Sequence, residues 1–188
     1  MRSGFFDKIQ LNPVIAAVND VTRLDEAIAS PCEIIFLLTG DIFNLESIIK
    51  KVKENKKSIY VHIDLIDGFS KNLTTLKYIN QKTDADGIIT TKNSFIRPAK
   101  SMGLFTIQRL FMLDSLSLDS GIESIKTIKP NAVEIMPGIM PEIVEKIHHE
   151  TSIPIITGGL IMNKDDVIQS LKSGAVGIST TKKEIWYL

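Results

Sequence analysis

Cysteine is almost missing from this 188-residue chain, which contains only Cys32. A single cysteine cannot form an intramolecular disulfide, and it leaves no cysteine cluster that could hold a metal ion. This usage fits a reducing, cytoplasmic location. We expect Cys32 to be a buried core residue rather than a reactive thiol, because free cysteine behaves as a small hydrophobic side chain.

Long hydrophobic runs and an excess of one charge are missing as well. No apolar run approaches the ~20 residues that a membrane-spanning helix needs, so we expect a soluble protein. The 22 basic and 22 acidic side chains cancel, and no overall field attracts nucleic acid or an anionic membrane. Any binding of RNA must therefore come from a local basic patch.

Hydrophobic residues make up 44% of the chain, enough for the core of one globular domain over residues 1–188. Short apolar runs, bounded by turn residues, alternate with amphipathic segments and predict parallel βαβ units. The eight runs are 14–18, 34–38, 59–65, 87–90, 105–111, 132–136, 154–157 and 175–179.

The segments between the runs have recognisable helix ends. The clearest is "NKDDVIQSLKSG", in which Asn163 is the expected N-cap and Gly174 the expected stop. Eight strand–helix units predict a compact α/β protein of the TIM-type (β/α)8 barrel class, although 188 residues is short for that fold. An open, doubly wound sheet remains the alternative, because periodicity does not reveal closure.

Polar residues follow several of the predicted strands, where a barrel of this type carries its functional site. Alternation along "YVHIDL" places His62 and Asp64 on the same face, and Glu134 alternates with apolar neighbours in the same way. A carboxylate directed into a barrel is costly without a partner. Arg109 is the natural partner, because a guanidinium binds a carboxylate or a ligand oxygen bidentately. Two interpretations of these residues are therefore kept: a structural salt bridge and a ligand-binding site.

Two glycines in "PIITGGLIMNKDD" follow the seventh predicted strand, and two hydroxyl residues in "GISTT" follow the eighth. Glycine serves where the backbone needs a positive φ or must come close to another group. Phosphate sites on this fold often use the loops after strands seven and eight. We therefore expect Gly158, Gly159, Ser179 and Thr180 to present N–H groups and hydroxyls to a phosphate.

Several blocks along most of the chain closely resemble a known family. They are "HIDLIDGFSKN", "DGIITTK", "GLFTIQRLFMLDS", "KPNAVEIMPGIMP", "PIITGGLI" and "GAVGISTTKKEIW". They resemble the glycerol-3-phosphate-responsive antiterminators of bacterial glycerol uptake operons. The resemblance implies a cytoplasmic, TIM-barrel-like regulator that binds glycerol 3-phosphate and acts on leader mRNA, without a cofactor, a metal ion or catalytic residues.

The resemblance also assigns a ligand mouth, to which Asp64, Arg109 and Glu134 would belong together with the glycines and hydroxyls above. One departure is "FSKN" after Gly68, where an acidic residue would be expected in place of Lys71 or Asn72. The contacts of this loop with a ligand are therefore open. The oligomeric state and the RNA element are open as well.

RNA binding would need one of two local clusters of cations. The six candidates are Lys50, Lys53, Lys57, Lys92, Arg97 and Lys100. The competing hypothesis is an enzyme, an isomerase, epimerase or aldolase acting on a small phosphorylated substrate. In that case Asp64 and Glu134 would serve as acid and base, and Lys92 as an electrophile or Schiff-base amine. Fold alone does not separate the two hypotheses.

Overall fold

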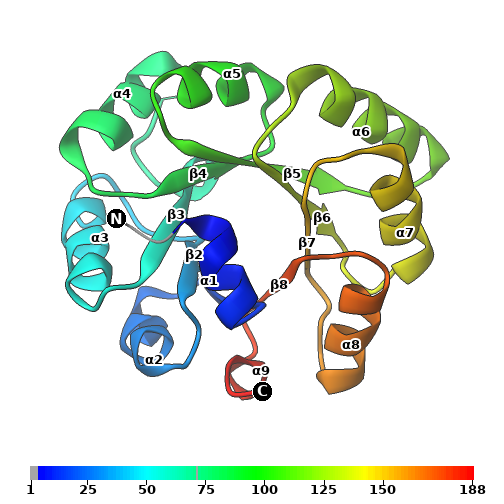
Figure 1. Cartoon of the computed structure of the whole chain (residues 1–188). Coiled ribbons are helices and arrows are strands. Elements are labelled where there is room, and N and C mark those ends of the chain that lie inside the picture. The colour runs from blue at the N-terminus through cyan, green and yellow to red at the C-terminus, as the bar shows by residue number, and fades with distance from the viewer. Residues whose placement is uncertain (1–3, 71) are drawn as a thin grey trace.

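In the computed structural model, which describes residues 4–70 and 72–188, the strands form one closed parallel barrel in the order of the sequence (Figure 1). The strands are β1 (Val14–Val18), β2 (Ile34–Leu37), β3 (Ser58–His62), β4 (Gly87–Thr90), β5 (Phe105–Phe111), β6 (Ala132–Met136), β7 (Ile155–Gly158) and β8 (Gly177–Thr180). Pairing of β1 with β8 closes the barrel. The barrel is therefore confirmed, and the open sheet is excluded.

Helices surround the barrel, and each β-strand is followed by a helix (Figure 1). They are α1 (Phe5–Leu11), α2 (Leu24–Ala29), α3 (Leu45–Glu54), α4 (Leu73–Lys82), α5 (Asn93–Ser101), α6 (Ser115–Ile128), α7 (Pro141–Glu150), α8 (Lys164–Lys172) and α9 (Lys183–Trp186), with 3-10 turns η1 (Val21–Arg23) and η2 (Ile63–Leu65). Among the described residues, no helix is long and apolar enough to cross a membrane.

The first helix closes one end of the barrel. Figure 1 shows α1 in front of the strands, at the end where they begin. The Phe5 ring stacks on Phe105 with the centroids 4.7 Å apart, and meets Tyr60 edge to face at 5.2 Å. A ligand therefore has to enter at the opposite end, where the strands finish.

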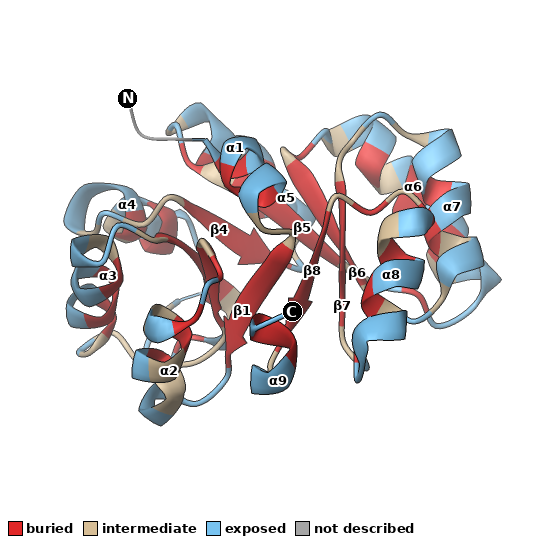
Figure 2. Cartoon of the chain, turned by 60° about the horizontal axis from the view of Figure 1, so that its bottom comes forward, coloured by how far each residue is buried: buried red, intermediate tan, exposed pale blue. Residues whose placement is uncertain are grey.

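Two apolar layers explain why the strands read as continuous hydrophobic runs. Inward side chains such as Ile15, Phe36 and Ile107 fill the barrel, while Ile35 and Ile88 pack outward against the helices. Strands buried on both faces lose the apolar–polar alternation of a half-exposed sheet. Figure 2 shows this burial along the strands, with exposed residues on the outer faces of the helices.

Most predicted boundaries agree with the structure to within two residues, but the prediction of one strand over 59–65 is wrong. Strand β3 ends at His62, and Ile63–Leu65 form a 3-10 turn. The Asp64 carboxylate accepts hydrogen bonds from Thr90 and Thr91, and so fixes this turn against the end of β4. Simple alternation from His62 to Asp64 therefore does not hold.

The predicted helix ends are confirmed where the local chemistry is strongest. The Asn163 side chain accepts a hydrogen bond from Asp166 N, within a capping box at the start of α8. Gly174, after the helix, has φ of +100°. Of the loop that departs from the family pattern, Asn72 caps α4, whereas Lys71 lies outside the described residues.

Candidate functional site

The loops that follow β7 and β8 line a cavity of about 170 Å³ at the open end of the barrel. Four predicted ligand residues line the cavity, namely Arg109, Gly159, Ser179 and Thr180. Leu160 to Met162, Thr181 and Lys182 also line it, and none of them was among the predicted ligand residues.

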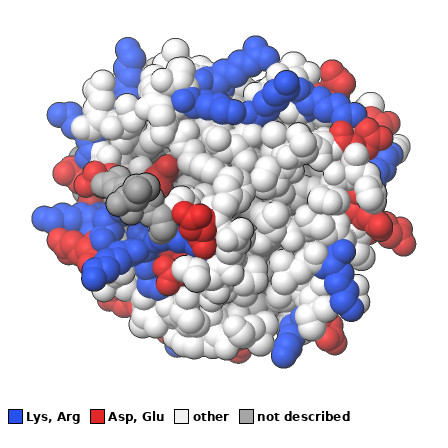
Figure 3. Space-filling model, in the orientation of Figure 1, with Lys and Arg blue, Asp and Glu red and all other residues white. Residues whose placement is uncertain are grey.

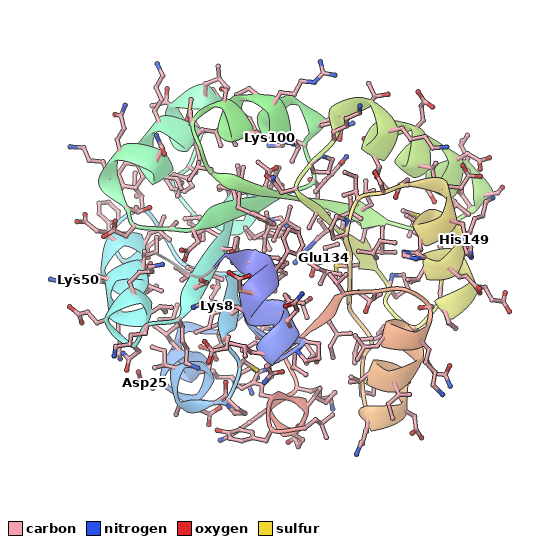
Figure 4. All side chains as sticks on the ribbon, in the orientation of Figure 1. Lys8, Asp25, Lys50, Lys100, Glu134 and His149 are labelled. Carbon is pink, nitrogen blue, oxygen red and sulfur yellow. The ribbon has the colours of Figure 1, made fainter. Side chains whose placement is uncertain are left out.

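A buried ion pair forms the floor of this site. Glu134 is fully buried on β6, and one of its oxygens accepts a hydrogen bond from Arg109 Nε at 2.7 Å. Its other oxygen accepts the hydroxyl of Ser179. Figure 4 shows Glu134 inside the barrel. Since both carboxylate oxygens have partners, Glu134 orients Arg109 and Ser179.

The Arg109 guanidinium keeps donors available for a ligand. Its Nε is directed to Glu134, and neither terminal nitrogen bonds another residue in the described part of the chain. The side chain is 7% exposed and lines the cavity. A fixed guanidinium with free terminal N–H groups is well placed to bind an oxyanion.

The two glycines meet two different requirements. A Cβ on Gly158 would stand 2.6 Å from Ser179 Oγ and 2.7 Å from Glu134 Oε1, so its absence makes room for the network on the floor. Gly159 has φ of +72° and turns the chain over the cavity. Both uses of glycine that the sequence suggested are therefore present.

We expect Gly159→Val to weaken binding of a phosphorylated ligand at least tenfold while the protein still folds. A β-branched side chain is strained at positive φ, at a cost of roughly 1–3 kcal/mol, and keeps a ligand away from the backbone. Calorimetric titration measures the affinity. Gly103→Val is the matched control, because Gly103 has φ of +84° with open space around its Cβ. Unchanged affinity in Gly159→Val would remove this loop from the site.

Thr180 joins the two loops. Its hydroxyl donates to Ile161 O at 3.4 Å and accepts from Lys182 N at 3.1 Å. The Thr180 hydroxyl thus holds the loops together, whereas Lys182 brings a second cation to the cavity. The signal for Lys182 was its place three residues after Ser179 in "STTKK".

Three of the predicted ligand residues, Asp64, Glu134 and Gly158, do not line the cavity. Gly158 lies beneath it, whereas Asp64 lies on the β3–β4 side of the mouth. Asp64 Oδ2 accepts from Thr90 Oγ1 at 2.9 Å and Thr91 N at 2.7 Å, and Lys92 Nζ lies 3.6 Å from Oδ1. Burial disfavours the charged form of Asp64 and by itself would raise the pKa of this carboxyl group. The hydrogen bonds from Thr91 and Thr90 outweigh burial, so the pKa of Asp64 is lowered.

His62 extends the polar layer from Asp64 toward Arg109. Its ring is 2% exposed, and Nδ1 lies 4.0 Å from Asp64 Oδ2 without a hydrogen-bond partner among the described residues. Burial, and then the nearby charge of Arg109, lower the pKa of His62 to about 4. The imidazole is therefore neutral at physiological pH.

The two candidate clusters of RNA-binding cations lie on different elements: Lys50, Lys53 and Lys57 on α3 and the turn before β3, and Lys92, Arg97 and Lys100 at or on α5. Lys53 pairs with Asp86 at 2.6 Å, and Lys57 Nζ donates to Ser30 O at 2.8 Å. Arg97 and Lys100 donate to the carbonyl oxygens of Thr127 and Lys129, at the end of α6. Lys92 stands at the mouth, while Lys50 is exposed on α3 (Figure 4).

Figure 3 shows basic side chains along the α5 side of the face that carries α1, and a mixed cluster of both signs near α3. That face is opposite the mouth.

No group of three or more His, Cys, Asp or Glu side chains in the described part of the chain could hold a metal ion.

Comparison with known proteins decides the family. The sequence model of the family described as glycerol-3-phosphate responsive antiterminator matches residues 14–186. The chain belongs to this family. The uncharacterized protein YgcP of Escherichia coli is 37% identical over 180 residues, which cover 96% of this chain and 94% of YgcP.

Two crystal structures, of a glycerol uptake operon antiterminator protein and of an antiterminator-related protein, are similar to this chain in both sequence and fold. The glycerol uptake operon antiterminator regulatory protein of Listeria monocytogenes is 30% identical with a TM-score of 0.90, covering 93% of this chain and 95% of its own. An antiterminator-related protein of Thermotoga maritima is 31% identical with a TM-score of 0.84, covering 94% and 98%.

An enzyme shares the fold of this antiterminator family member at lower identity. The N-acetylmannosamine-6-phosphate 2-epimerase of Clostridium perfringens is 15% identical, with a TM-score of 0.73, covering 96% of this chain and 90% of that enzyme. At this identity the likeness concerns the fold alone.

Proposed function

We propose that this antiterminator family member binds glycerol 3-phosphate in the cavity beside β7 and β8, and that binding regulates its action on leader mRNA of a glycerol operon. One observation carries the ligand assignment. Glu134 holds the Arg109 guanidinium at the cavity, and Lys182 adds a second cation. Because the Glu134 charge is already neutralised by Arg109, Lys182 leaves the site with a net positive charge that suits a phosphate dianion.

The orientation of the ligand follows from the same geometry. The phosphate lies against the backbone of Gly159 to Ile161 and of Thr180 to Lys182, since these segments line the cavity. The glycerol hydroxyls then point toward the β3–β4 side of the mouth. There Asp64 Oδ1 is buried and accepts no hydrogen bond from a described residue.

A thermal-shift series with glycerol 3-phosphate, glycerol and inorganic phosphate tests the ligand assignment. A ligand at 100 times its dissociation constant stabilises the folded state by about 2.7 kcal/mol. We expect this shift with glycerol 3-phosphate at concentrations where glycerol and phosphate have little effect. Equal shifts with phosphate and glycerol 3-phosphate would contradict recognition of the glycerol part.

We expect Asp64→Asn to weaken glycerol 3-phosphate binding by about three- to tenfold, since one hydrogen bond to a hydroxyl contributes on the order of 1 kcal/mol. Calorimetry gives the dissociation constant. Asp67→Asn is the control, because Asp67 is an exposed carboxylate three residues further along the same segment. Equal losses in both variants would argue against a direct role of Asp64.

A second function, an enzyme acting on a small phosphorylated substrate, has one observation in its favour. Asp64, Lys92 and the neutral His62 lie together at the mouth, as an acid–base site would require. Turnover of a triose or sugar phosphate by the purified protein, abolished by Asp64→Asn, would replace the regulator by the enzyme.

A further inference from the structure

A groove of about 590 Å³ runs beside the mouth, between the start of α5 and α6. On α6 it is lined by Ser117, Ser120, Gly121 and Ser124, at the spacing that places residues on one helix face. Helix faces that pack against a neighbour are usually apolar. This face is small and polar instead, and the space beside it is open.

Beneath the groove lies a buried amide with an unused acceptor. Gln108 is fully buried, and its Nε2 donates to Asn93 and, at 2.7 Å, to Ser124 Oγ. Asn93 and Ser124 both line the groove. Gln108 Oε1 has no hydrogen-bond partner among the described residues. A buried acceptor without a partner is unfavourable, but Oε1 is itself covered and does not line the groove. The polar character of the groove comes instead from the amide of Asn93 and the serine hydroxyls that line it.

Two more residues of the groove narrow the class of ligand. Phe111, at the end of β5, is 49% exposed and lines the groove, whereas Lys92 brings a cation from the start of α5. Serine hydroxyls complete the lining. Single-stranded RNA matches this set, because its bases stack on aromatic rings, its phosphates need cations and its 2′-hydroxyls pair with polar groups.

We propose that the α5–α6 groove binds a single-stranded segment of RNA. A helical peptide fits less well, because helix-in-groove binding needs a row of apolar pockets. Double-stranded RNA fits less well too, because its paired and stacked bases cannot use Phe111. The groove thus brings together Lys92, which the sequence suggested for RNA, and residues of β5 and α6 that it did not suggest.

The groove is connected to the ligand mouth through Asp64, and this step rests on the proposed function. Asp64 holds Thr91 by two hydrogen bonds and lies 3.6 Å from the ammonium of Lys92. Thr91 and Lys92 both line the groove. Asp64 Oδ1 is buried and lies outside the lining of the cavity, so a ligand hydroxyl reaches it only by displacing the Lys92 ammonium, and this displacement releases the charge of Lys92 for an RNA phosphate. Glycerol 3-phosphate therefore strengthens RNA binding, and RNA strengthens glycerol 3-phosphate binding by the same factor.

The test measures fluorescence anisotropy of a labelled random-sequence pool of single-stranded RNA, with and without saturating glycerol 3-phosphate. We expect Phe111→Ala to weaken binding about 5- to 150-fold, the usual effect of losing one base–aromatic stack. Ser120→Glu weakens it as well, since it places a carboxylate in the groove. Lys92→Gln lowers the slope of log affinity against log salt by about 0.7, as expected for one phosphate contact on a single strand.

Matched controls carry the same changes away from the groove. Phe43→Ala removes an exposed phenylalanine that follows β2, where Phe43 is 95% exposed. Ser47→Glu alters a serine on α3 whose hydroxyl donates to Asn44 O at 2.7 Å, as the Ser120 hydroxyl donates to Leu116 O at 2.7 Å. Both controls are expected to bind RNA as the unmodified protein does.

Several outcomes would contradict the proposal that the α5–α6 groove binds RNA. They are no RNA binding by the unmodified protein at any salt concentration, equal losses in the controls, and duplex RNA binding as tightly as single strands. Calorimetry with glycerol 3-phosphate, run on the same samples, keeps the two proposals apart. If glycerol 3-phosphate binds normally and the groove variants still bind RNA as tightly as the unmodified protein, only the proposal that the groove binds RNA is contradicted. If glycerol 3-phosphate does not bind, the proposed function is contradicted. The RNA titrations without ligand then still show whether the groove binds RNA.

Discussion

Replacing Arg109 by Met is expected to lower the free energy of unfolding by about 3–5 kcal/mol, because it leaves a buried carboxylate without its counter-ion. Glu134 has no exposed surface, and Arg109 is its only cationic partner among the described residues. Urea unfolding at neutral pH measures the loss. The same variant is expected to lose glycerol 3-phosphate binding, since the terminal N–H groups at the cavity are gone.

A double variant separates stability from binding. In Arg109→Met/Glu134→Met both charges are removed, and buried ion pairs replaced by apolar residues of similar volume are often as stable as the original pair. We expect the double variant to regain most of the lost stability but no ligand affinity. A loss below about 1 kcal/mol in the single variant, or a double variant that is no more stable than the single one, would show that the pair is not the buried network described above.

Acid is expected to destabilise the protein between pH 6.5 and about 4 through His62. The unfolded chain takes up a proton near the ordinary histidine pKa of 6.5, whereas burial and Arg109 hold the folded-state pKa of His62 at about 4. Protonation therefore favours the unfolded state as the pH falls through this window, by up to about 3 kcal/mol. Above pH 6.5 the contribution of His62 does not change with pH.

Unfolding in urea at a series of pH values measures this effect. His62→Gln is expected to flatten the pH dependence over the same window, since glutamine does not titrate. His149→Gln is the control, because the His149 side chain is 73% exposed. Asp64 affects stability at a lower pH than His62. Because the pKa of Asp64 is lowered in the folded state, its contribution to the free energy of unfolding is lost only when acid protonates the carboxylate. Equal slopes for His62→Gln and the unmodified protein would contradict a buried, neutral His62.

The sequence by itself predicted the strand–helix units and the barrel class, and it named several residues that line the candidate site. The eight apolar runs predicted the strands, because strands buried on both faces must be apolar throughout. The Gly158–Gly159 pair predicted a special backbone, since other residues are costly at positive φ or at close contact. The polar strand ends predicted a site at the carboxyl end of the barrel, where parallel strands bring distant residues together, and a cavity lies there beside β7 and β8.

Only the tertiary structure decided which of these residues meet. It directed Glu134 to Arg109 and Ser179, moved Asp64 to the opposite side of the mouth, and separated the cations into distinct locations. None of this could be read from the sequence, because it depends on register around the closed barrel and on hydrogen bonds between residues 25 to 45 positions apart. Closure itself was also undetermined, since a run of apolar residues is equally buried in an open sheet and in a barrel.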